Sequence, residues 1–170
     1  PLVFNFHGYS SNAVQQMWYG DFRSIADDKG FIVVHPNGTL DDNGITHWNV
    51  GWGDSTVDDI GFTDALIDSI AEEYNIDLDR IYSTGMSNGG FMSYHLACQL
   101  SGRIAAIASV TGSMNIGWFN SCNSTHPMPI MEIHGTADPT VPYTASSFTE
   151  SISDIMDFWV NYNNCNPEAI

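Results

Sequence analysis

Apolar and polar positions follow two different rhythms along this chain. Short apolar runs, rich in β-branched and aromatic residues, are typical of strands buried on both faces of a parallel sheet. Between them lie longer segments whose apolar residues recur at helical spacing. Strands that alternate with helices predict an α/β fold, a mostly parallel sheet with helices on both faces. The five predicted strands cover residues 2–7, 31–35, 81–84, 104–110 and 129–134.

The first two predicted helices are recognised by the residues at their ends. Apolar residues from Trp18 onward share one face of the first helix, and Gly30 ends it. Asp58 and Asp59 stand at the beginning of the second helix. Paired carboxylates also serve in acid–base catalysis, but capping a helix and facing the positive end of its dipole is the favoured interpretation. The apolar faces comprise Trp18, Phe22, Ile25 and Ala26 in the first helix and Phe62, Leu66, Ile70 and Tyr74 in the second.

Two further helices follow in the second half of the chain. One runs from Asn88 to about Leu100, and the other opens at a capping box formed by Ser147 and Glu150. Both carry an apolar face that we expect to pack on the sheet. These faces comprise Met92, Leu96 and Leu100 in the first, and Phe148, Ile152, Ile155, Met156 and Trp159 in the second.

The third strand leads directly into Gly85-Met86-Ser87-Asn88-Gly89 and then into a helix. This order of strand, turn and helix is the context of the G-x-S-x-G nucleophile elbow, in which a tight turn lifts the serine above the end of the sheet. Gly85 and Gly89 lack a Cβ, so strand and helix can approach each other closely. The alternative is a surface turn in a glycine-rich chain. The flanking strand and helix favour Ser87 as a nucleophile.

The loop after the first strand is expected beside Ser87, because ligands of parallel sheets bind beyond the carboxyl ends of the strands. Acyl transfer needs N–H donors for the developing oxyanion. In the elbow motif one donor is the residue after the nucleophile, here Asn88, and the other comes from this loop, where we assign it to Tyr9. A rival interpretation makes His7 a base or metal ligand. The glycine that follows His7 favours the backbone role for this loop.

Asp138 is the candidate acid of a catalytic triad. It lies in the exit loop of the last strand, where it could orient a histidine, although Asp-Pro is also a frequent turn starter. The chain order of this architecture is serine, acid, histidine, so the base should follow Asp138. We therefore expect the catalytic histidine to lie outside this sequence, since all its histidines precede Asp138: His7, His35, His47, His95, His126 and His134.

Two long loops carry aromatic residues that could line a substrate site. Residues 36–57 form a polar loop with two tryptophans, and residues 113–128 form a second loop. Loops of such length in a compact domain are functional or disordered, and tryptophans indicate order. The candidates for an apolar substrate wall are Trp48, Trp52, Trp118 and Phe119, and packing in the core is an equally good interpretation for each.

Charge and composition restrict the partners. The chain has 20 acidic and four basic residues, a net charge of −16, and a hydrophobic content of 43%. Such a surface repels nucleic acid, anionic membranes and polyanionic substrates, so a neutral or weakly charged substrate is favoured. No apolar run approaches the ~20 residues of a membrane helix. We expect neither a nucleic-acid nor a membrane partner.

The three cysteines have no spacing typical of a metal site. Cys98, Cys122 and Cys165 lie near helix ends or before strands, at the edge of the sheet opposite to Ser87. A disulfide with one remaining thiol is possible, and three thiols fit the count equally well. A catalytic cysteine is not expected, nor is a metal or a cofactor.

Four motifs in register, spread over nearly the whole chain, resemble one group of α/β-hydrolases, the polyhydroxybutyrate depolymerases and feruloyl esterases (similar to carbohydrate esterase family 1). The resemblance implies extracellular hydrolysis of carboxylic esters, with Ser87 as nucleophile and Asp138 as acid. Members of the group carry strands before the first one here, and a further strand and a histidine after the last helix. Residues 1–170 are therefore expected to form one hydrolase domain that is incomplete at both ends. The motifs are His7-Gly8-Tyr9-Ser10, residues 57–62, residues 85–90, and residues 134–138 with Val141-Pro142-Tyr143.

The predicted function is a serine ester hydrolase of the feruloyl or acetyl-xylan type, acting on a small ester or an ester-bearing polymer outside the cell or in the periplasm. A polyhydroxybutyrate depolymerase is the alternative with the same chemistry. Prolyl-oligopeptidase-type peptidases share the His-Gly-x-x-Asp and Val-Pro pattern at residues 134–142. A hydrolase fold that has lost its base and serves only for binding is the alternative from another class.

Overall fold

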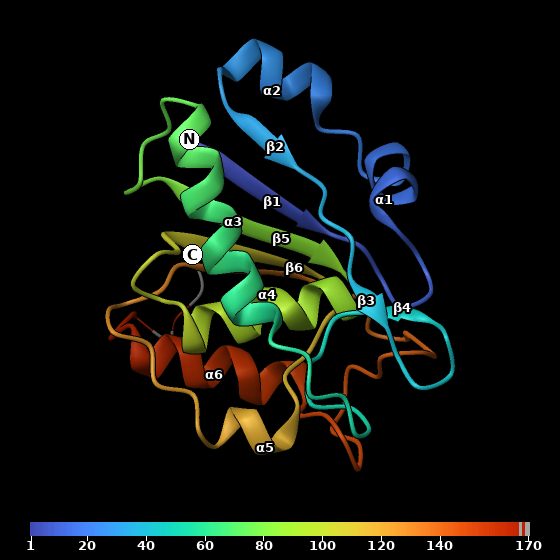
Figure 1. Ribbon diagram of the computed structural model, residues 1–170. Coiled ribbons are helices and arrows are strands. Elements are labelled where there is room, and N and C mark those ends of the chain that lie inside the picture. The colour runs from blue at the N-terminus through green and yellow to red at the C-terminus, as the bar shows by residue number, and fades with distance from the viewer. Residues whose placement is uncertain (167, 169–170) are drawn as a thin grey trace.

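A parallel sheet of five strands forms the centre of the protein (Figure 1). The computed structural model describes residues 1–166 and residue 168. The strand order is β2-β1-β5-β6-β7, so the chain starts near one edge, crosses the middle and ends at the other edge. This confirms the predicted parallel sheet. Its strands are β1 (Leu2–Phe6), β2 (Ile32–Val34), β5 (Ile81–Met86), β6 (Ala106–Val110) and β7 (Ile130–Ile133).

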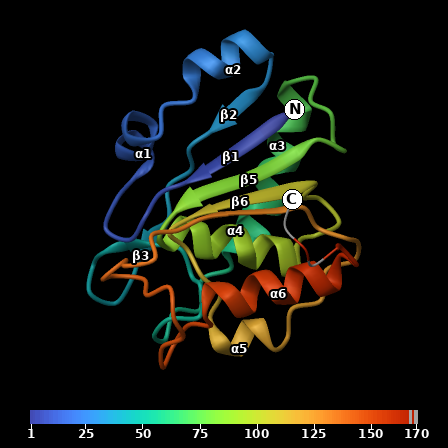
Figure 2. The same cartoon turned by 180° about the vertical axis from the view of Figure 1, so that it is seen from behind.

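Helices lie on both faces of the sheet, as Figures 1 and 2 show from opposite sides. α4 contacts β1, β5 and β6. α1 lies on the other face, where Gln16 donates a hydrogen bond to the side chain of Asn5, a β1 residue that points away from α4. The helices are α1 (Ala13–Tyr19), α2 (Arg23–Lys29), α3 (Asp59–Glu73), α4 (Asn88–Gln99), α5 (Ile116–Phe119) and α6 (Ile152–Tyr162).

The two faces of the sheet are buried to different degrees. Successive strand residues point to opposite faces. On the face toward α4, Leu2, Phe4 and Phe6 of β1 are completely buried. On the other face Val3 is half-buried, and Met131 of β7 is 59% exposed. Most of the hydrophobic core therefore lies between the sheet and α4.

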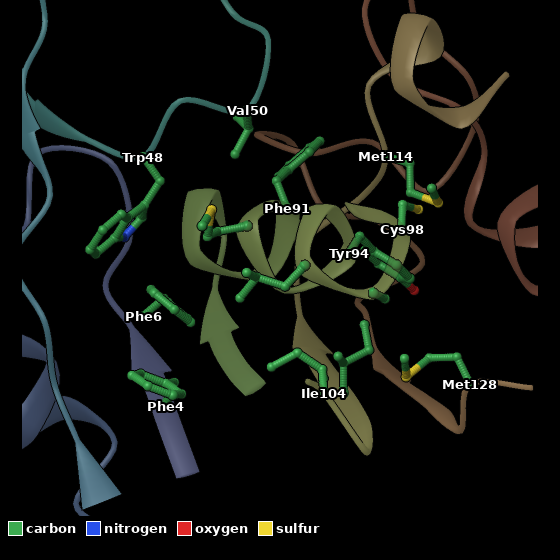
Figure 3. Packing of buried hydrophobic residues seen from close by; sticks show 14 of the residues in the cluster. Phe4, Phe6, Trp48, Val50, Phe91, Tyr94, Cys98, Ile104, Met114 and Met128 are labelled. Carbon is green, nitrogen blue, oxygen red and sulfur yellow. The ribbon is translucent and has the colours of Figure 1, made fainter. Parts of the chain in front are cut away.

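Trp48 extends this core beyond the end of the sheet (Figure 3). Its ring meets Phe6 edge-on at a centroid distance of 4.9 Å and stacks with Phe62 of α3 at 6.4 Å. It is only 1% exposed. The loop that carries Trp48 contains a short hairpin of β3 (Thr39–Leu40) and β4 (Thr46–His47). This loop is thus ordered, as its tryptophans predicted.

Helix α4 approaches the sheet through glycines. A Cβ at Gly85 would lie 2.6 Å from the backbone of Gly89, and a Cβ at Gly89 would overlap the carbonyl group of Phe6. Real Cβ atoms do not come so close to backbone atoms. Backbone therefore touches backbone where β1, β5 and α4 meet, as the elbow motif predicted.

The first predicted helix is two helices. Asn12 caps α1 by accepting from the N–H of Gln15, and α1 ends at Tyr19. α2 begins at Arg23 and ends, as predicted, at Gly30, which has a φ of 67°. The assumed common apolar face was wrong, because Trp18 is 66% exposed and the chain turns before Phe22.

The predicted opening of the last helix was also wrong. Ser151, not Ser147, caps α6, and its hydroxyl accepts from the N–H of Asp154. Ser147 and Glu150 precede the helix, and Phe148, which was expected to face inward, is 69% exposed. Two Ser-x-x-acid patterns occur four residues apart, and the second one is in phase with the buried residues Ile152, Ile155 and Trp159.

The second helix begins as predicted and packs with part of the predicted face. Asp58 caps α3 by accepting from the N–H of Gly61. Leu66 and Ile70 pack against the core as predicted, beside the fully buried Thr63 and Ile67, whereas Phe62 and Tyr74 are 42% and 55% exposed. In the described part of the chain, no helix is long and apolar enough to cross a membrane.

A disulfide bond joins Cys98 at the end of α4 to Cys122 in the loop after α5. Cys165 is a free, exposed thiol. The structure therefore selects the arrangement of one disulfide and one thiol. The bond lies at the end of α4 that is remote from Ser87.

We expect Gly89→Ala to lower the free energy of unfolding by about 1–3 kcal/mol, the usual cost of forcing extra volume into a packed site. Gly102→Ala is the matched control, because a Cβ there meets nothing within 4 Å. At that position alanine should be neutral or slightly stabilising. Urea unfolding of both variants and the parent measures the difference. Equal midpoints for the two variants would contradict the close contact.

Candidate active site

Ser87 stands at the turn between β5 and α4. Its φ of 53° and ψ of −118° lie in a region that non-glycine residues rarely adopt. The turn is held by two backbone hydrogen bonds, from the Ser87 N–H to the Val110 carbonyl and from the Gly90 N–H to the Ser87 carbonyl, both 2.8 Å long. Ser10 and Thr111, in the loops that follow β1 and β6, also have positive φ angles. Strained residues therefore gather at the carboxyl edge of the sheet, where functional sites often store strain.

The backbone N–H groups of Tyr9 and Asn88, both near Ser87, have no hydrogen-bond partner within the described residues. Asn88 is the first residue of α4, so its N–H is free because no preceding turn exists to accept it. Tyr9 lines the same pocket as Ser87. These are the two N–H groups that the sequence pattern assigned to an oxyanion hole.

His7 controls the peptide group that precedes Tyr9. Its Nε2 accepts from the N–H of Gly38 at 2.9 Å, so its proton is on Nδ1, which donates to the Gly8 carbonyl at 2.8 Å. The carbonyl of Gly8 and the N–H of Tyr9 belong to one trans peptide and point in opposite directions. Burial lowers the pKa of His7, which favours this neutral form. His7 is completely buried and does not line the Ser87 pocket, so it is placed as a support for the loop.

The side chain of Asn88 joins the elbow to the loop that contains Trp48. Its Oδ1 accepts from the Trp48 N–H at 2.7 Å, and its Nδ2 donates to the Trp48 carbonyl at 3.0 Å. The indole N–H of Trp48 donates in turn to the carbonyl of His7 at 3.1 Å. The sequence pattern pointed only to the backbone of Asn88. These side-chain roles have no periodicity and no motif of their own, so only the structure reveals them.

Asp138 lies in a tight loop after β7. Its Oδ1 accepts from the N–H groups of Thr140 at 2.8 Å and Val141 at 3.0 Å. The hydrogen bond from Val141, and next the one from Thr140, lowers the pKa of Asp138 because both stabilise the ionised carboxylate. Its Oδ2 has no partner within the described residues, so this oxygen is free to accept a hydrogen bond from another group. Thr140 and Val141 line the same pocket as Ser87.

His134 anchors the Asp138 loop. Because a carbonyl can only accept, its Nε2 donates to the Val141 carbonyl, at 2.8 Å. Its Nδ1 lies 2.9 Å from Oε1 of Glu132, and the other carboxylate oxygen accepts from the hydroxyl of Tyr94 in α4. Burial raises the pKa of Glu132. A chain of hydrogen bonds therefore runs from α4 to the Asp138 loop, and His134 has a structural role in it.

None of the six histidines lines the pocket around Ser87. His95 stacks on Trp118 with ring centroids 3.4 Å apart, and burial lowers its pKa to about 4. The remaining rings are used in polar contacts within the fold. His35 contacts Asn5, His47 contacts Thr39 and Ser55, and His126 contacts Pro127 and Ser101. Residues 1–166 and 168 thus bring no general base to Ser87.

A pocket of about 630 Å³ opens in front of Ser87. Of the three tryptophans named as substrate candidates, Trp52 lines this pocket. Its ring meets the ring of Phe91 edge-on at a centroid distance of 4.6 Å. Trp48 is in the core, and Trp118 packs on His95 outside the pocket. The other lining residues are largely apolar or small: Tyr9, Gly51, Gly53, Phe91, Thr140, Val141, Pro142, Ser146, Phe148 and Thr149.

The acidic pair that begins α3 belongs to the fold. Asp59 is 4% exposed and accepts from the N–H of Asn49 at 2.6 Å, and burial raises its pKa. Asp58 caps the helix. Neither lines the Ser87 pocket. Over the residues that the structure describes, no three His, Cys, Asp or Glu side chains form a group able to hold a metal ion.

The fold is similar to that of solved esterases. The carboxylesterase of Bacillus cereus matches 98% of this chain and 76% of its own, with a TM-score of 0.67 and 17% identity. The acetyl xylan esterase of Aspergillus awamori matches 83% of this chain and 64% of its own, with a TM-score of 0.65 and 19% identity. At these identities the likeness shows an α/β-hydrolase fold, as the sequence predicted.

Curated relatives are similar in sequence. A bifunctional acetylxylan esterase/xylanase of Neocallimastix patriciarum is 33% identical over 143 residues, which are 84% of this chain and 20% of the relative. A probable feruloyl esterase C of Aspergillus niger is 29% identical in an alignment that covers 99% of this chain and 58% of the relative. The chain thus spans from a fifth to less than two thirds of the length of these relatives.

The resemblance to feruloyl esterases is therefore confirmed. A family model described as Phospholipase/Carboxylesterase matches residues 2–163, nearly the whole chain. This range contains β1, the elbow at Ser87, the Asp138 loop and α6. The chain belongs to the phospholipase/carboxylesterase family of α/β-hydrolases.

Proposed function

We propose that this chain carries the nucleophile, the acid and the oxyanion hole of a serine carboxylic-ester hydrolase. The observation that supports this most directly is the strained turn at Ser87, which opens into a pocket beside two free N–H groups. Such preorganised donors stabilise the charge that develops on an ester carbonyl oxygen. The family of the chain supports the same chemistry.

In the proposed mechanism, Oγ of Ser87 attacks the ester carbonyl carbon while a general base accepts the hydroxyl proton. The carbonyl oxygen becomes an oxyanion and accepts from the N–H groups of Asn88 and Tyr9. Collapse of this tetrahedral intermediate expels the alcohol, which takes the proton from the protonated base. Water then attacks the acyl-enzyme by the same route, releasing the carboxylic acid and restoring Ser87.

The base is proposed to be a histidine from a part of the protein outside residues 1–170. The positions of the six histidines in this chain support that assignment, because none of them lines the pocket around Ser87. Asp138 would orient this histidine through Oδ2, the oxygen that its own loop leaves free. Because its pKa is lowered, Asp138 stays ionised in mildly acidic solution and can stabilise the protonated base.

The substrate is proposed to be an ester-bearing polysaccharide or a small ester, with a feruloyl or acetyl group as the acyl part. An apolar pocket with Trp52 and Phe91 suits an aromatic acyl group, and relatives named feruloyl and acetylxylan esterases support the class. The protein is proposed to act outside the cell. The disulfide between Cys98 and Cys122 supports this location, because such bonds persist in oxidising compartments.

We expect Ser87→Ala to lower kcat for a nitrophenyl ester by about 10⁴-fold or more in the full-length protein, since the acyl-enzyme can no longer form. Release of nitrophenol measures the rate. Ser24→Ala, an exposed serine of α2, is the matched control and should keep the parent rate. Turnover that persists in Ser87→Ala would show that another residue is the nucleophile.

Asp138→Asn should lower kcat by about 10²- to 10⁴-fold with little change in KM, as in other triads that lose the charge of their acid. The asparagine oxygen can still accept from Thr140 and Val141, so its amide group would replace the free Oδ2. Asp157→Asn is the matched control, because it removes the same charge at an exposed position of α6. Equal rates in the two variants would remove Asp138 from the mechanism.

A further inference from the structure

A second pocket of about 420 Å³ adjoins the Ser87 pocket. Tyr9, Trp52 and Gly53 line both cavities, so these residues form a shared wall. Ser87 lines only the first. We call the second cavity the hairpin pocket, because the β3–β4 hairpin and the segment after Trp52 enclose it. It is also lined by Leu40, Asp41, Asp42, Asn43, His47, Asp54, Ser55, Thr56 and Val57.

The two cavities differ in chemistry. Beyond the shared wall, the Ser87 pocket presents apolar side chains such as Phe91, Val141 and Phe148. The hairpin pocket presents carboxylates, an amide and hydroxyl groups. Such a pair of adjoining cavities suits a ligand with one apolar and one polar part.

Some polar groups of the hairpin pocket are already used by the fold. Asp41 accepts from the Tyr9 hydroxyl at 2.6 Å and from the N–H groups of Asn43 and Ile45 at 2.9 Å. His47 contacts the hydroxyl of Ser55 at 3.0 Å. These bonds fix the pocket walls. The exposed carboxylates of Asp42 and Asp54 accept no hydrogen bond from another described residue, so they are available to a ligand.

The proposed reaction places an ester across the shared wall. Its carbonyl carbon must lie at Ser87 and its carbonyl oxygen near the N–H of Tyr9, a residue of that wall. The acyl and alcohol parts extend in different directions from the carbonyl carbon. With the apolar acyl part in the Ser87 pocket, the neighbouring cavity across the shared wall is open to the alcohol part.

We propose that the hairpin pocket binds the alcohol part of the ester, and that this part is neutral and rich in hydroxyl groups, as in a sugar. This inference rests on the proposed ester hydrolysis. Carboxylates accept strong, charge-assisted hydrogen bonds from hydroxyl groups. The same carboxylates repel an anionic alcohol. The pocket thus favours sugar esters over polyesters, whose alcohol part is an apolar hydroxyacid chain.

The test compares two esters of ferulic acid, the methyl ester and the ester of arabinose, in the full-length protein. The kcat/KM for the arabinose ester divided by that for the methyl ester isolates the contribution of the alcohol part, because the acyl part is identical. Asp54→Ala should lower this ratio about 3- to 10-fold, the effect of one hydrogen bond to a charged group at a solvent-exposed site. Asp42→Ala is the second variant. Asp27→Ala, on the distant helix α2, removes the same charge and should leave the ratio unchanged (Figure 1).

Thermal unfolding of each variant checks that the fold is retained. A lowered ratio in Asp54→Ala or Asp42→Ala, with the parent ratio in Asp27→Ala, supports the inference. The parent ratio in both pocket variants overturns it, as does a parent enzyme that prefers the methyl ester. If the parent hydrolyses neither ester nor a nitrophenyl ester, the proposed function itself fails, which is a different result.

Discussion

The contact between α4 and the sheet at Gly85 and Gly89 is the constraint on which the rest of the site depends. Here a helix meets two strands through backbone atoms alone, with Phe6 of β1 on the other side of the contact. This close approach goes with a tight turn between β5 and α4, in which Ser87 has a strained φ of 53°. The same approach brings the first turn of α4 beside the end of β1. The candidate nucleophile Ser87 and the N–H of Asn88 are therefore positioned by this packing contact, whereas the peptide between Gly8 and Tyr9 is held by His7.

Buried polar groups then set the relative positions of the loops around Ser87. Asn88, Trp48 and His7 are almost completely buried, and each satisfies a backbone group of another loop. A buried hydrogen-bond network of this kind is stabilising when complete and costly when one member is missing. Apolar packing alone would tolerate small shifts of the loop after β1. Hydrogen bonds with fixed directions do not, and an oxyanion hole needs that accuracy because its donors must point at one oxygen.

The sequence was most informative where a local rule and the tertiary structure agree. The five strands, the elbow, the cap at Asp58 and the end of α2 at Gly30 were predicted, because alternation, glycine and capping residues act over a few neighbours. The errors arose where packing decided between equal local signals. Ser147 and Ser151 offer the same cap, and only the burial of Ile155 and Trp159 selects the second. Trp48 and Trp52 occupy the same loop, yet one fills the core and the other faces the pocket. No pattern along the chain encodes that difference.

The proposed chemistry and the proposed selectivity of this site are carried by different parts of the fold. Ser87, the free N–H groups and Asp138 are held by the sheet and α4, and the hydroxyl of Tyr94 ties that helix to the acid loop through Glu132 and His134. The walls of the two pockets come largely from loops, the hairpin segment on one side and residues 139–149 on the other, together with Phe91 of α4. Loops can change without disturbing the contact at Gly89. Under the proposed function, such a protein can therefore acquire a different alcohol or acyl preference while the candidate nucleophile keeps the same strained turn.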